Sequence, residues 1–311
     1  MPIPQSYCPV CGSPKRRSLP VLNRWEGVLW HHIRCNYCGH RYTDPVPEDV
    51  QLARMYNDAY FSETGSWVCG FWSGSYHENE RNLRAEARET LSFLEKKNGR
   101  LLEIGAGGGF LLDEARMAGF DVTGVELNAT MAEWGRSNLG LNIITEPFES
   151  SILEPASFEV IVAQDVLEHV RDPRGFVGRV KRLLAPGGTF FVRGPLEDDT
   201  KGRVYGLLRR LPGRGPRLLD EPPYHLQGFV HRSFSHLVRD SGLVLKKFLV
   251  VPGKPTWSFN TGKTVISSGI EWICFQIDRL RGGGDFMIAH ATKEPAGLNP
   301  LEALPGEQAD C

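Results

Sequence analysis

One stretch of this chain, residues 100–128, restricts the fold more than any other part of the sequence. Its sequence, RLLEIGAGGGFLLDEARMAGFDVTGVELN, opens with a short apolar run typical of a buried strand. Four of the next five residues are glycine, which indicates a turn whose bare backbone a ligand can approach. Residues 110–117 then have the apolar spacing of a helix, and residues 121–125 form a second strand pattern that ends on Glu126. This order of strand, turn, helix and strand predicts the first unit of a doubly wound α/β fold.

The acids around the glycines indicate which cofactor this unit binds. Glu126 lies 19 residues after Gly107, where such a fold places the carboxylate that binds ribose hydroxyls. A dinucleotide site requires a third glycine at the start of the helix, but Phe110 occupies that position. The pattern is instead E-x-G-x-G-x-G, and its leading acid, Glu103, would repel a pyrophosphate. An acid at this place suits S-adenosylmethionine, which has an ammonium and a sulfonium group and no phosphate.

Further motifs place this sequence beside a known family. Residues 158–163, FEVIVA, form another buried-strand pattern and run into QDVLEHV at residues 164–170. A helix is predicted over residues 176–184, closed by Pro186-Gly187-Gly188 before a strand at residues 189–192. With the glycine motif, these phrases resemble the class I S-adenosylmethionine-dependent methyltransferases over about residues 100–195, and more loosely to residue 293. The resemblance implies a Rossmann-like, doubly wound sheet of seven strands; the alternative is another Rossmann enzyme with a nucleotide-like turn.

The resemblance also implies a set of cofactor-binding residues. Glu103 is expected to face the methionine end of S-adenosylmethionine, and Glu126 is expected to accept both ribose hydroxyls. Phe148 and Glu149 are placed at the adenine edge by resemblance alone. The expected cofactor-binding residues are Glu103, Gly105, Gly107, Gly109, Glu126, Phe148, Glu149 and Gln164.

Four of the seven cysteines form two C-x-x-C pairs near the N-terminus, Cys8 with Cys11 and Cys35 with Cys38. Glycine follows each pair, and such a turn lets backbone N–H groups point at a thiolate. Two similar turns separated by 23 residues can converge on a tetrahedral four-sulfur site for structural Zn²⁺. The pattern resembles the zinc ribbon that precedes some bacterial methyltransferase domains. A redox or disulfide pair is the alternative, which the repetition of the turn disfavours.

Two histidines, His169 and His225, fall where the resemblance places the active face. Asp165, Glu168 and His169 have i, i+3, i+4 spacing, so one helical turn would bring them onto one face. Their D-V-L-E-H phrase resembles the E-x-x-E-H site of quinone-pathway O-methyltransferases, which holds a divalent cation such as Mg²⁺, although Asp165 replaces the first glutamate. His169 is therefore a general base, a metal ligand or a structural residue. His225, beside Tyr224 on the loop expected to cover the acceptor, is the clearer candidate for a catalytic base.

The motifs divide the chain into segments. A zinc ribbon is expected over residues 1–45 and a helical and aromatic linker with a lid over 46–98. The methyltransferase domain is expected over residues 99–293, with an acceptor-side insertion at about 196–232, and a disordered tail over 294–311. Ser233 is expected to cap a helix over residues 234–240. Five arginines within residues 203–217 indicate either a solvated helix face or a site for an anionic acceptor, such as a phosphorylated or nucleotide-linked sugar.

Composition limits the partners and the location. The formal net charge is −1 and charges of both signs are well mixed, which disfavours a nucleic-acid partner. No apolar stretch approaches the roughly 18 residues that cross a bilayer, and no secretory leader is recognised. A cytoplasmic protein is therefore expected.

These observations together predict an enzyme that transfers a methyl group from S-adenosylmethionine to a small molecule or a glycan precursor, most simply by O-methylation. One alternative is a ribosomal-RNA methyltransferase, because zinc modules also precede some of those enzymes. The N-P-P-Y type phrase of the enzymes that methylate adenine or glutamine nitrogen is absent, and the chain is not basic. The other alternative is a non-enzymatic binding protein that retains the fold, which the intact glycine turn and Glu126 disfavour.

Overall fold

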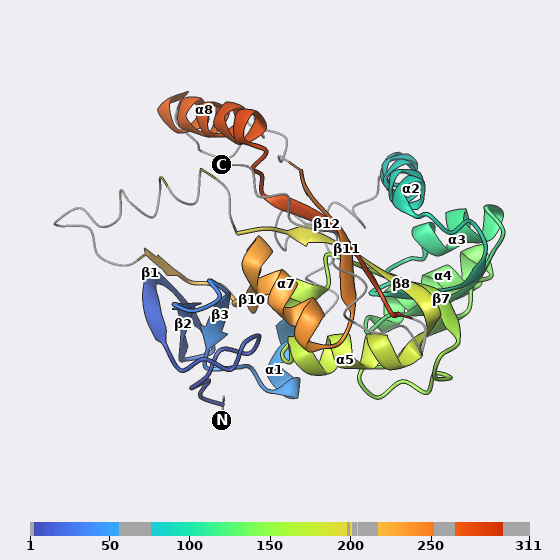
Figure 1. Cartoon of the computed structure of the whole chain (residues 1–311), viewed down its shortest axis with the longest axis horizontal. Coiled ribbons are helices and arrows are strands. Elements are labelled where there is room, and N and C mark those ends of the chain that lie inside the picture. The colour runs from blue at the N-terminus through green and yellow to red at the C-terminus, as the bar shows by residue number, and fades with distance from the viewer. Residues whose placement is uncertain are drawn as a thin grey trace, which may run out of the picture.

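The structure, a computed structural model, describes residues 3–55, 76–197, 200, 204, 217–251 and 265–294. In this part of the chain, a seven-stranded sheet forms the centre and a five-stranded sheet lies to one side of it (Figure 1). Several sequence predictions fall outside the described residues. These are residues 56–75 of the predicted linker and lid, most of the arginine-rich stretch and the tail from residue 295 onward.

The large sheet has the strand order β11-β12-β8-β7-β4-β5-β6, which confirms the predicted doubly wound fold. Its strands are β4 (Gly99–Ile104), β5 (Phe120–Val125), β6 (Ile143–Ile144), β7 (Phe158–Gln164), β8 (Leu184–Pro195), β11 (Val244–Val251) and β12 (Phe286–Thr292). Five neighbouring strands, β8-β7-β4-β5-β6, pair in parallel, whereas β12 is antiparallel to both β8 and β11. The chain builds outward from β4 in one direction and then returns to its other side with β7. Ligands of open α/β sheets bind at such a reversal, beyond the carboxyl ends of the strands.

Alternate residues of the central strands enter two separate cores because successive side chains of a strand point to opposite faces. Val160 and Val162 pack with the helices α2 (Tyr76–Phe93) and α3 (Phe110–Met117). Ile161 and Ala163 pack instead with α5 (Pro173–Leu183) and α7 (His231–Asp240). The helix α4 (Ala129–Leu139) is capped by Asn128, whose side chain accepts a hydrogen bond from the Met131 N–H at 2.9 Å.

The smaller sheet has the order β10-β3-β2-β1-β9 and joins two distant parts of the sequence. Its strands are β1 (Arg16–Trp25), β2 (Val28–Cys35), β3 (Arg41–Asp44), β9 (Arg217–Leu219) and β10 (Gln227–Gly228). The β1–β2 hairpin turns at Glu26 and Gly27, which both have positive φ, as a two-residue hairpin of the I′ type requires. We call residues 8–44, with their two cysteine turns and strands β1–β3, the ribbon. Its buried residues Val10, Ile33 and Tyr42 belong to the same hydrophobic core as α5 and α7. The ribbon is therefore packed on the side of the large sheet that these two helices cover.

Two local predictions were wrong. The helix α5 ends at Leu183, and the Pro186-Gly187-Gly188 stretch lies inside β8 because Leu184 already pairs with Phe158 of β7. Ser233 is the third residue of α7 and not its cap: its hydroxyl accepts a hydrogen bond from the Val230 N–H at 3.0 Å, so the helix begins earlier, at His231. In both cases pairing or capping by a neighbouring residue moved the boundary.

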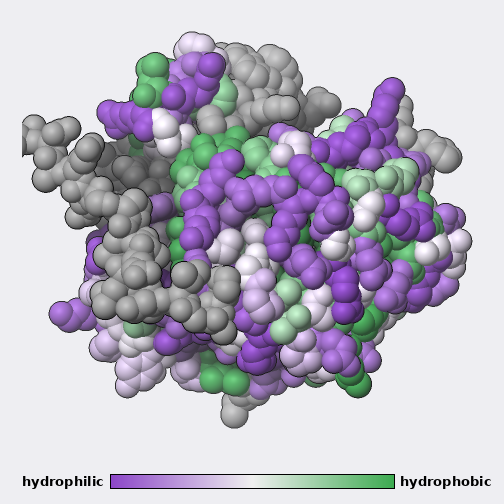
Figure 2. Space-filling view, turned by 45° about the vertical axis from the view of Figure 1, so that its right-hand side comes forward, coloured by the Kyte–Doolittle hydropathy of each residue, from purple (hydrophilic) through white to green (hydrophobic). Residues whose placement is uncertain are grey.

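The remaining helices are α1 (Asp49–Met55) and α8 (Val265–Arg281), and no helix was predicted for α8. Figure 1 shows α8 at the end of the molecule away from α5. Among the helices that the structure describes, none is both long and apolar enough to span a membrane. In the view of Figure 2, hydrophilic side chains are spread over the visible face with smaller hydrophobic areas between them.

Candidate functional site

The glycine turn between β4 and α3 is a tight fold of backbone. Gly105, Gly107 and Gly109 have φ values of 74°, 52° and 84°, a region that residues with a side chain rarely adopt. A Cβ on Gly105 would lie 2.5 Å from Val166 Cγ2, and one on Gly109 would lie 2.4 Å from Leu141 Cδ1. The turn therefore needs glycine for its own conformation and packing, in addition to any approach by a ligand.

Glu126 closes this turn from the end of β5. One oxygen of its carboxylate accepts a hydrogen bond from the Gly107 N–H at 2.7 Å, and the other accepts one from the Asn128 N–H at 2.8 Å. The carboxylate is buried, and burial raises its pKa while these N–H groups oppose the rise. Each oxygen retains a further lone pair, so Glu126 can still accept hydrogen bonds from a ligand.

Glu103, on β4, is the second buried acid of the turn. Its Oε2 has no hydrogen-bond partner among the residues that the structure describes. Burial, followed by the nearby charge of Glu126, raises the pKa of Glu103 well above its ordinary value. At the end of β7, the Gln164 Oε1 is likewise buried without a partner among the described residues. The turn thus presents acceptors that only a ligand with hydrogen-bond donors or positive charge would satisfy.

The two residues expected at the adenine edge have different surroundings. The Phe148 ring is buried, and its centroid lies 4.9 Å from that of the Phe176 ring. The Arg179 guanidinium lies 5.1 Å from the centroid of the Phe148 ring. Glu149 is exposed. Their assignment to the cofactor remains a prediction.

The predicted triad of Asp165, Glu168 and His169 does not share one helical face. Residues Leu167–His169 form a short 3-10 helix, and Asp165 precedes it in a left-handed conformation with φ of 50°. The groups that converge are instead Glu168, His169 and His225, whose potential ligand atoms lie within 4.8 Å of one another. The ring centroids of the two histidines are 5.1 Å apart, and the His169 Nδ1–H donates to the Tyr224 carbonyl at 2.8 Å. The structure therefore brings the two predicted histidines together and replaces Asp165 by His225 in the cluster.

The protonation states in this cluster follow from burial. Burial raises the pKa of Glu168 to about 8, so this carboxyl is mostly protonated at neutral pH. Although Asp165 is exposed as a residue, protein atoms around its carboxyl and the nearby Glu168 raise its pKa to about 7. Burial lowers the pKa of His169 to about 4. Although His225 is exposed as a residue, protein atoms around its ring and the nearby His169 lower its pKa. Both imidazoles are therefore neutral at pH 7 and able to accept a proton.

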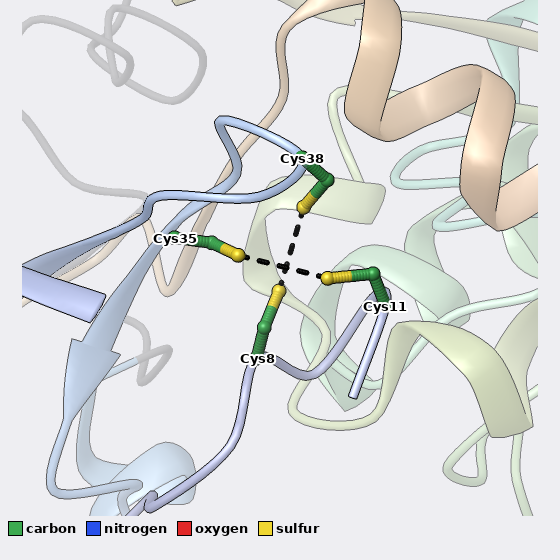
Figure 3. Close-up of side chains that lie close together, drawn as sticks. All are labelled: Cys8, Cys11, Cys35 and Cys38. Carbon is green, nitrogen blue, oxygen red and sulfur yellow. Dashed lines mark hydrogen bonds between the residues drawn. The ribbon is translucent and has the colours of Figure 1, made fainter. Parts of the chain in front are cut away.

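The four predicted cysteine ligands point toward one centre (Figure 3). The Cys8 and Cys38 sulfurs are 3.6 Å apart, as are those of Cys11 and Cys35, and all four lie within 4.8 Å of one another. Tetrahedral Zn²⁺ with Zn–S bonds of about 2.3 Å would separate its sulfurs by about 3.8 Å, close to this arrangement. Contact with Cys38, followed by backbone N–H groups, lowers the pKa of Cys8 to about 6 despite its burial.

Other residues beside the histidine cluster were not predicted. Asn23 and His32 of the ribbon form a hydrogen bond of 2.7 Å, and Asn23 also contacts the segment that carries His225. Gln227 links His40 of the ribbon to the backbone after β7. These pairs are separated by as many as 198 residues in the sequence, so no local spacing could have identified them.

The comparisons with known proteins agree with this geometry. A family model described as methyltransferase domain matches residues 76–247, more than half of the 311-residue chain. The chain therefore belongs to the methyltransferase-domain family, and its seven-stranded sheet is that of the class I S-adenosylmethionine-dependent methyltransferases.

Curated relatives are similar over part of their length. The chain is 28% identical over 152 residues to the ubiquinone biosynthesis O-methyltransferase of Xylella fastidiosa (strain M23), which covers 46% of this chain and 61% of the relative. It is 37% identical over 115 residues to the protein of the same name from Paraburkholderia phymatum, covering 35% of this chain and 49% of that one. The chain thus spans less than two thirds of the length of these relatives.

Solved structures share the fold at low sequence identity. A chain from a complex that contains the Haloferax volcanii Trm112 methyltransferase activator has a TM-score of 0.51 and 14% identity, over 72% of this chain and 97% of that one. The geranyl diphosphate C-methyltransferase from Streptomyces coelicolor A3(2) has a TM-score of 0.49 and 14% identity, over 75% and 90%. At 14% identity the likeness to the first of these chains concerns the fold alone.

Proposed function

We propose that this protein transfers a methyl group from S-adenosylmethionine to a hydroxyl of a small-molecule or sugar-linked acceptor. One observation carries the cofactor assignment: two buried carboxylates, Glu103 and Glu126, flank a glycine turn, and one of their oxygens has no partner among the described residues. The ammonium and sulfonium groups of S-adenosylmethionine would favour the ionised form of these acids and be attracted to it, whereas a phosphate would not. When bound, the cofactor supplies an electrophilic methyl group, and the chain holds and orients the two reactants.

The residues present fit this cofactor. Glu126 has lone pairs left for ribose hydroxyls after accepting two backbone hydrogen bonds. Glu103, on the neighbouring strand β4, would meet the methionine end of the cofactor. A cation beside it would favour its ionised form against the effect of burial. Gly105 and Gly107 would lie against the cofactor, with Gly109 at the start of α3. Gln164, Phe148 and Glu149 complete the proposed set.

The type of acceptor is supported by the names of the relatives and by the neutral histidines. Both relatives are called O-methyltransferases, and a hydroxyl acceptor must lose a proton as it is methylated. His225 is exposed beside Tyr224 and has an unprotonated ring nitrogen at pH 7, as a general base requires, although its lowered pKa makes it a weaker base than a free imidazole. His169 donates through Nδ1 to the Tyr224 carbonyl, so a role as base or metal ligand would fall to its Nε2.

A divalent cation is the second proposal for the same cluster. The sequence placed Mg²⁺ on Asp165, Glu168 and His169, and the geometry favours Glu168, His169 and His225 instead. A protonated Glu168 would have to lose its proton to bind a cation, and the cation's charge would favour that loss. The proposal includes acceptors with an anionic group, because the arginine-rich stretch at residues 203–217 could bind one. Of its five arginines the structure describes only Arg217, which is exposed.

We further propose that Cys8, Cys11, Cys35 and Cys38 hold structural Zn²⁺. The sulfur separations fit a tetrahedral ion, and the surrounding strands bury three of the four cysteines. The Gly12 and Gly39 N–H groups bond to the Cys8 and Cys35 carbonyls at 2.9 and 3.1 Å, which forms the two turns. A module of this size has a small core of its own, so metal ligation would supply much of its stability.

Calorimetric titration with S-adenosylmethionine tests the cofactor assignment. Glu126→Ala removes hydrogen bonds to a charged group that contribute about 1.5–3 kcal/mol each, so affinity should fall roughly 10- to 150-fold or more. Glu133→Ala is the matched control, because Glu133 is an exposed acid on the neighbouring helix α4. Zinc content should be unchanged in both variants. Unchanged affinity in Glu126→Ala would contradict the assignment. A separate experiment identifies the acceptor: mass spectrometry of cell extracts incubated with the protein and deuterated cofactor would show which molecule gains the label.

A further inference from the structure

Residues 217–228 carry Tyr224 and His225, and the ribbon holds this segment at both ends. At its start, β9 pairs in parallel with β1. At its end, β10 pairs antiparallel with β3, where Gln227 is opposite Tyr42. Just before that, the Leu226 carbonyl accepts a hydrogen bond from the Thr43 N–H at 3.0 Å. The segment is therefore bound to the ribbon's sheet, and not to the seven-stranded sheet that holds the cofactor turn.

Between these ends, one buried ribbon side chain reaches the segment's backbone. The Asn23 Nδ2 donates to the Glu221 carbonyl at 3.1 Å and lies 3.4 Å from the Pro222 carbonyl, while Asn23 itself is 3% exposed. Its Oδ1 accepts a hydrogen bond of 2.7 Å from the His32 Nε2–H. The His32 bond occupies the amide oxygen and so directs the amide nitrogen toward the two carbonyls.

The far side of the segment contacts the loop that follows β7. The Tyr224 carbonyl accepts the hydrogen bond from His169, and the Gln227 Nε2 donates to the Val170 carbonyl at 2.9 Å. The segment is thus fixed between the ribbon and the loop of the acidic and histidine residues. His225 itself is exposed, and the position of its ring depends on the backbone of residues 220–226, which these contacts determine.

We propose that Asn23, oriented by His32, is a positioning residue for His225, and that the ribbon is a structural part of the acceptor site. This inference rests on the proposed methyl transfer, for which His225 must lie within reach of the acceptor. A catalytic group displaced by about 1 Å can lose roughly 100-fold in rate, so a backbone anchor at Glu221 and Pro222, three to four residues before His225, has a direct effect on turnover. The zinc ligands would act through the same strands, by holding β1–β3 in register.

Two substitutions at one position separate positioning from folding. Asn23→Asp keeps the volume and the acceptor for His32 but has no N–H for the Glu221 and Pro222 carbonyls. Asn23→Ala removes both interactions. The matched control is Arg24→Ala, because Arg24 is the next residue of β1 and contacts Asp220 of the same segment through an exposed ion pair of 2.7 Å. His32→Gln, which retains a donor for Asn23, serves as the conservative variant.

Hydrogen exchange measured by mass spectrometry on the full, zinc-loaded chain gives the decisive readout. In Asn23→Asp, amides of residues 224–228 should exchange about tenfold faster, the loss expected for one hydrogen bond of about 1.4 kcal/mol. Exchange elsewhere, zinc content and S-adenosylmethionine affinity in Asn23→Asp should match the wild type. In Arg24→Ala these three readouts and exchange at residues 224–228 should all match the wild type. His32→Gln should lie near the wild type. With a low-molecular-weight cell extract as the acceptor source, release of S-adenosylhomocysteine should fall roughly 10- to 100-fold in Asn23→Asp at saturating cofactor.

Wild-type exchange at residues 224–228 in both Asn23 variants would overturn the proposal. Equally faster exchange at these residues in Arg24→Ala would overturn it too, because loss of any contact between the ribbon and the segment would then have the same effect as loss of the Asn23 bond. If Asn23→Asp loses zinc or unfolds, His32→Ala is the second test, because it releases the amide oxygen without placing a charge beside the two carbonyls; normal exchange and turnover in that variant would also count against the pair. Failure of the proposed function has a different signature: the wild type would not bind S-adenosylmethionine, whatever the exchange at residues 224–228.

Discussion

The cofactor turn and the acceptor side of this molecule are built in opposite ways. The turn, its two acids and the helix that follows all come from residues 100–128, and Val166 and Leu141 pack against them from outside this stretch. The acceptor side unites ribbon residues near position 23, the loop after β7 near position 169 and the segment around His225. One half can therefore form through local interactions, whereas the other requires three distant segments to meet. It follows that substitutions in one half should leave the other half's function largely intact.

The largest expected effect is on the ribbon. Cys35→Ser should remove the zinc, whose binding contributes about 10–16 kcal/mol of apparent free energy in small zinc modules, and should lower the temperature of thermal unfolding. Elemental analysis and calorimetry measure the two effects. Cys274→Ser, at a buried cysteine of α8 outside the two C-x-x-C pairs, is the control. If the two halves are separable, S-adenosylmethionine affinity should change by less than about threefold, a difference of under 1 kcal/mol. Iron in place of zinc, or no metal in the wild type, would contradict the site.

Next in size is the effect of His225→Ala on turnover. A positioned base contributes roughly 10²–10⁴ in rate, so turnover should fall by that factor while cofactor affinity holds. A loss smaller than about tenfold with the true acceptor would remove His225 from this role. Assays with added Mg²⁺ or with EDTA separate the two proposals for the cluster: only a metal site makes the wild-type rate depend on the cation.

A comparison of two glycines examines the cofactor half. Gly105 and Gly140 both have positive φ, but a Cβ on Gly105 would meet Val166 at 2.5 Å while one on Gly140 would meet nothing within 4 Å. Substitution by alanine should therefore cost about 1 kcal/mol of unfolding free energy at Gly140 and roughly 1–3 kcal/mol at Gly105. Only Gly105→Ala should weaken S-adenosylmethionine binding. Denaturant titration and calorimetry would show this, and equal effects at both positions would mean that the turn's packing has no part in the site.

The smallest effect concerns the pH dependence of stability. Because the pKa of Glu168 is raised to about 8, the folded state binds more protons than the unfolded state between about pH 4.5 and pH 8. The free energy of unfolding should therefore fall as pH rises through this window. Glu168→Gln removes the contribution, so the variant should match the wild type near pH 4 and exceed it by roughly 1 kcal/mol or more at pH 8. Urea unfolding in EDTA at both pH values measures the difference, and a difference independent of pH would contradict the burial argument.

The sequence by itself determined the parts of this protein whose interactions are local. The glycine turn, α3 and the strands that frame it were predicted almost to the residue, because their conformations depend on positive φ at glycine and on regular apolar spacing. The two cysteine turns were equally readable, since metal ligation requires the same short motif twice. The arrangement around His225 was decided by tertiary structure.

Contacts between distant segments changed several local expectations. Pairing with β7 drew residues 184–188 into a strand, and the left-handed conformation at Asp165 removed that residue from the metal-ligating cluster. The bond from Asn23 to residue 221 crosses 198 positions and uses a backbone carbonyl, a group that every residue possesses. Such a partner leaves no mark in the sequence, because its identity is set by the pairing of β9 with β1 and not by its side chain.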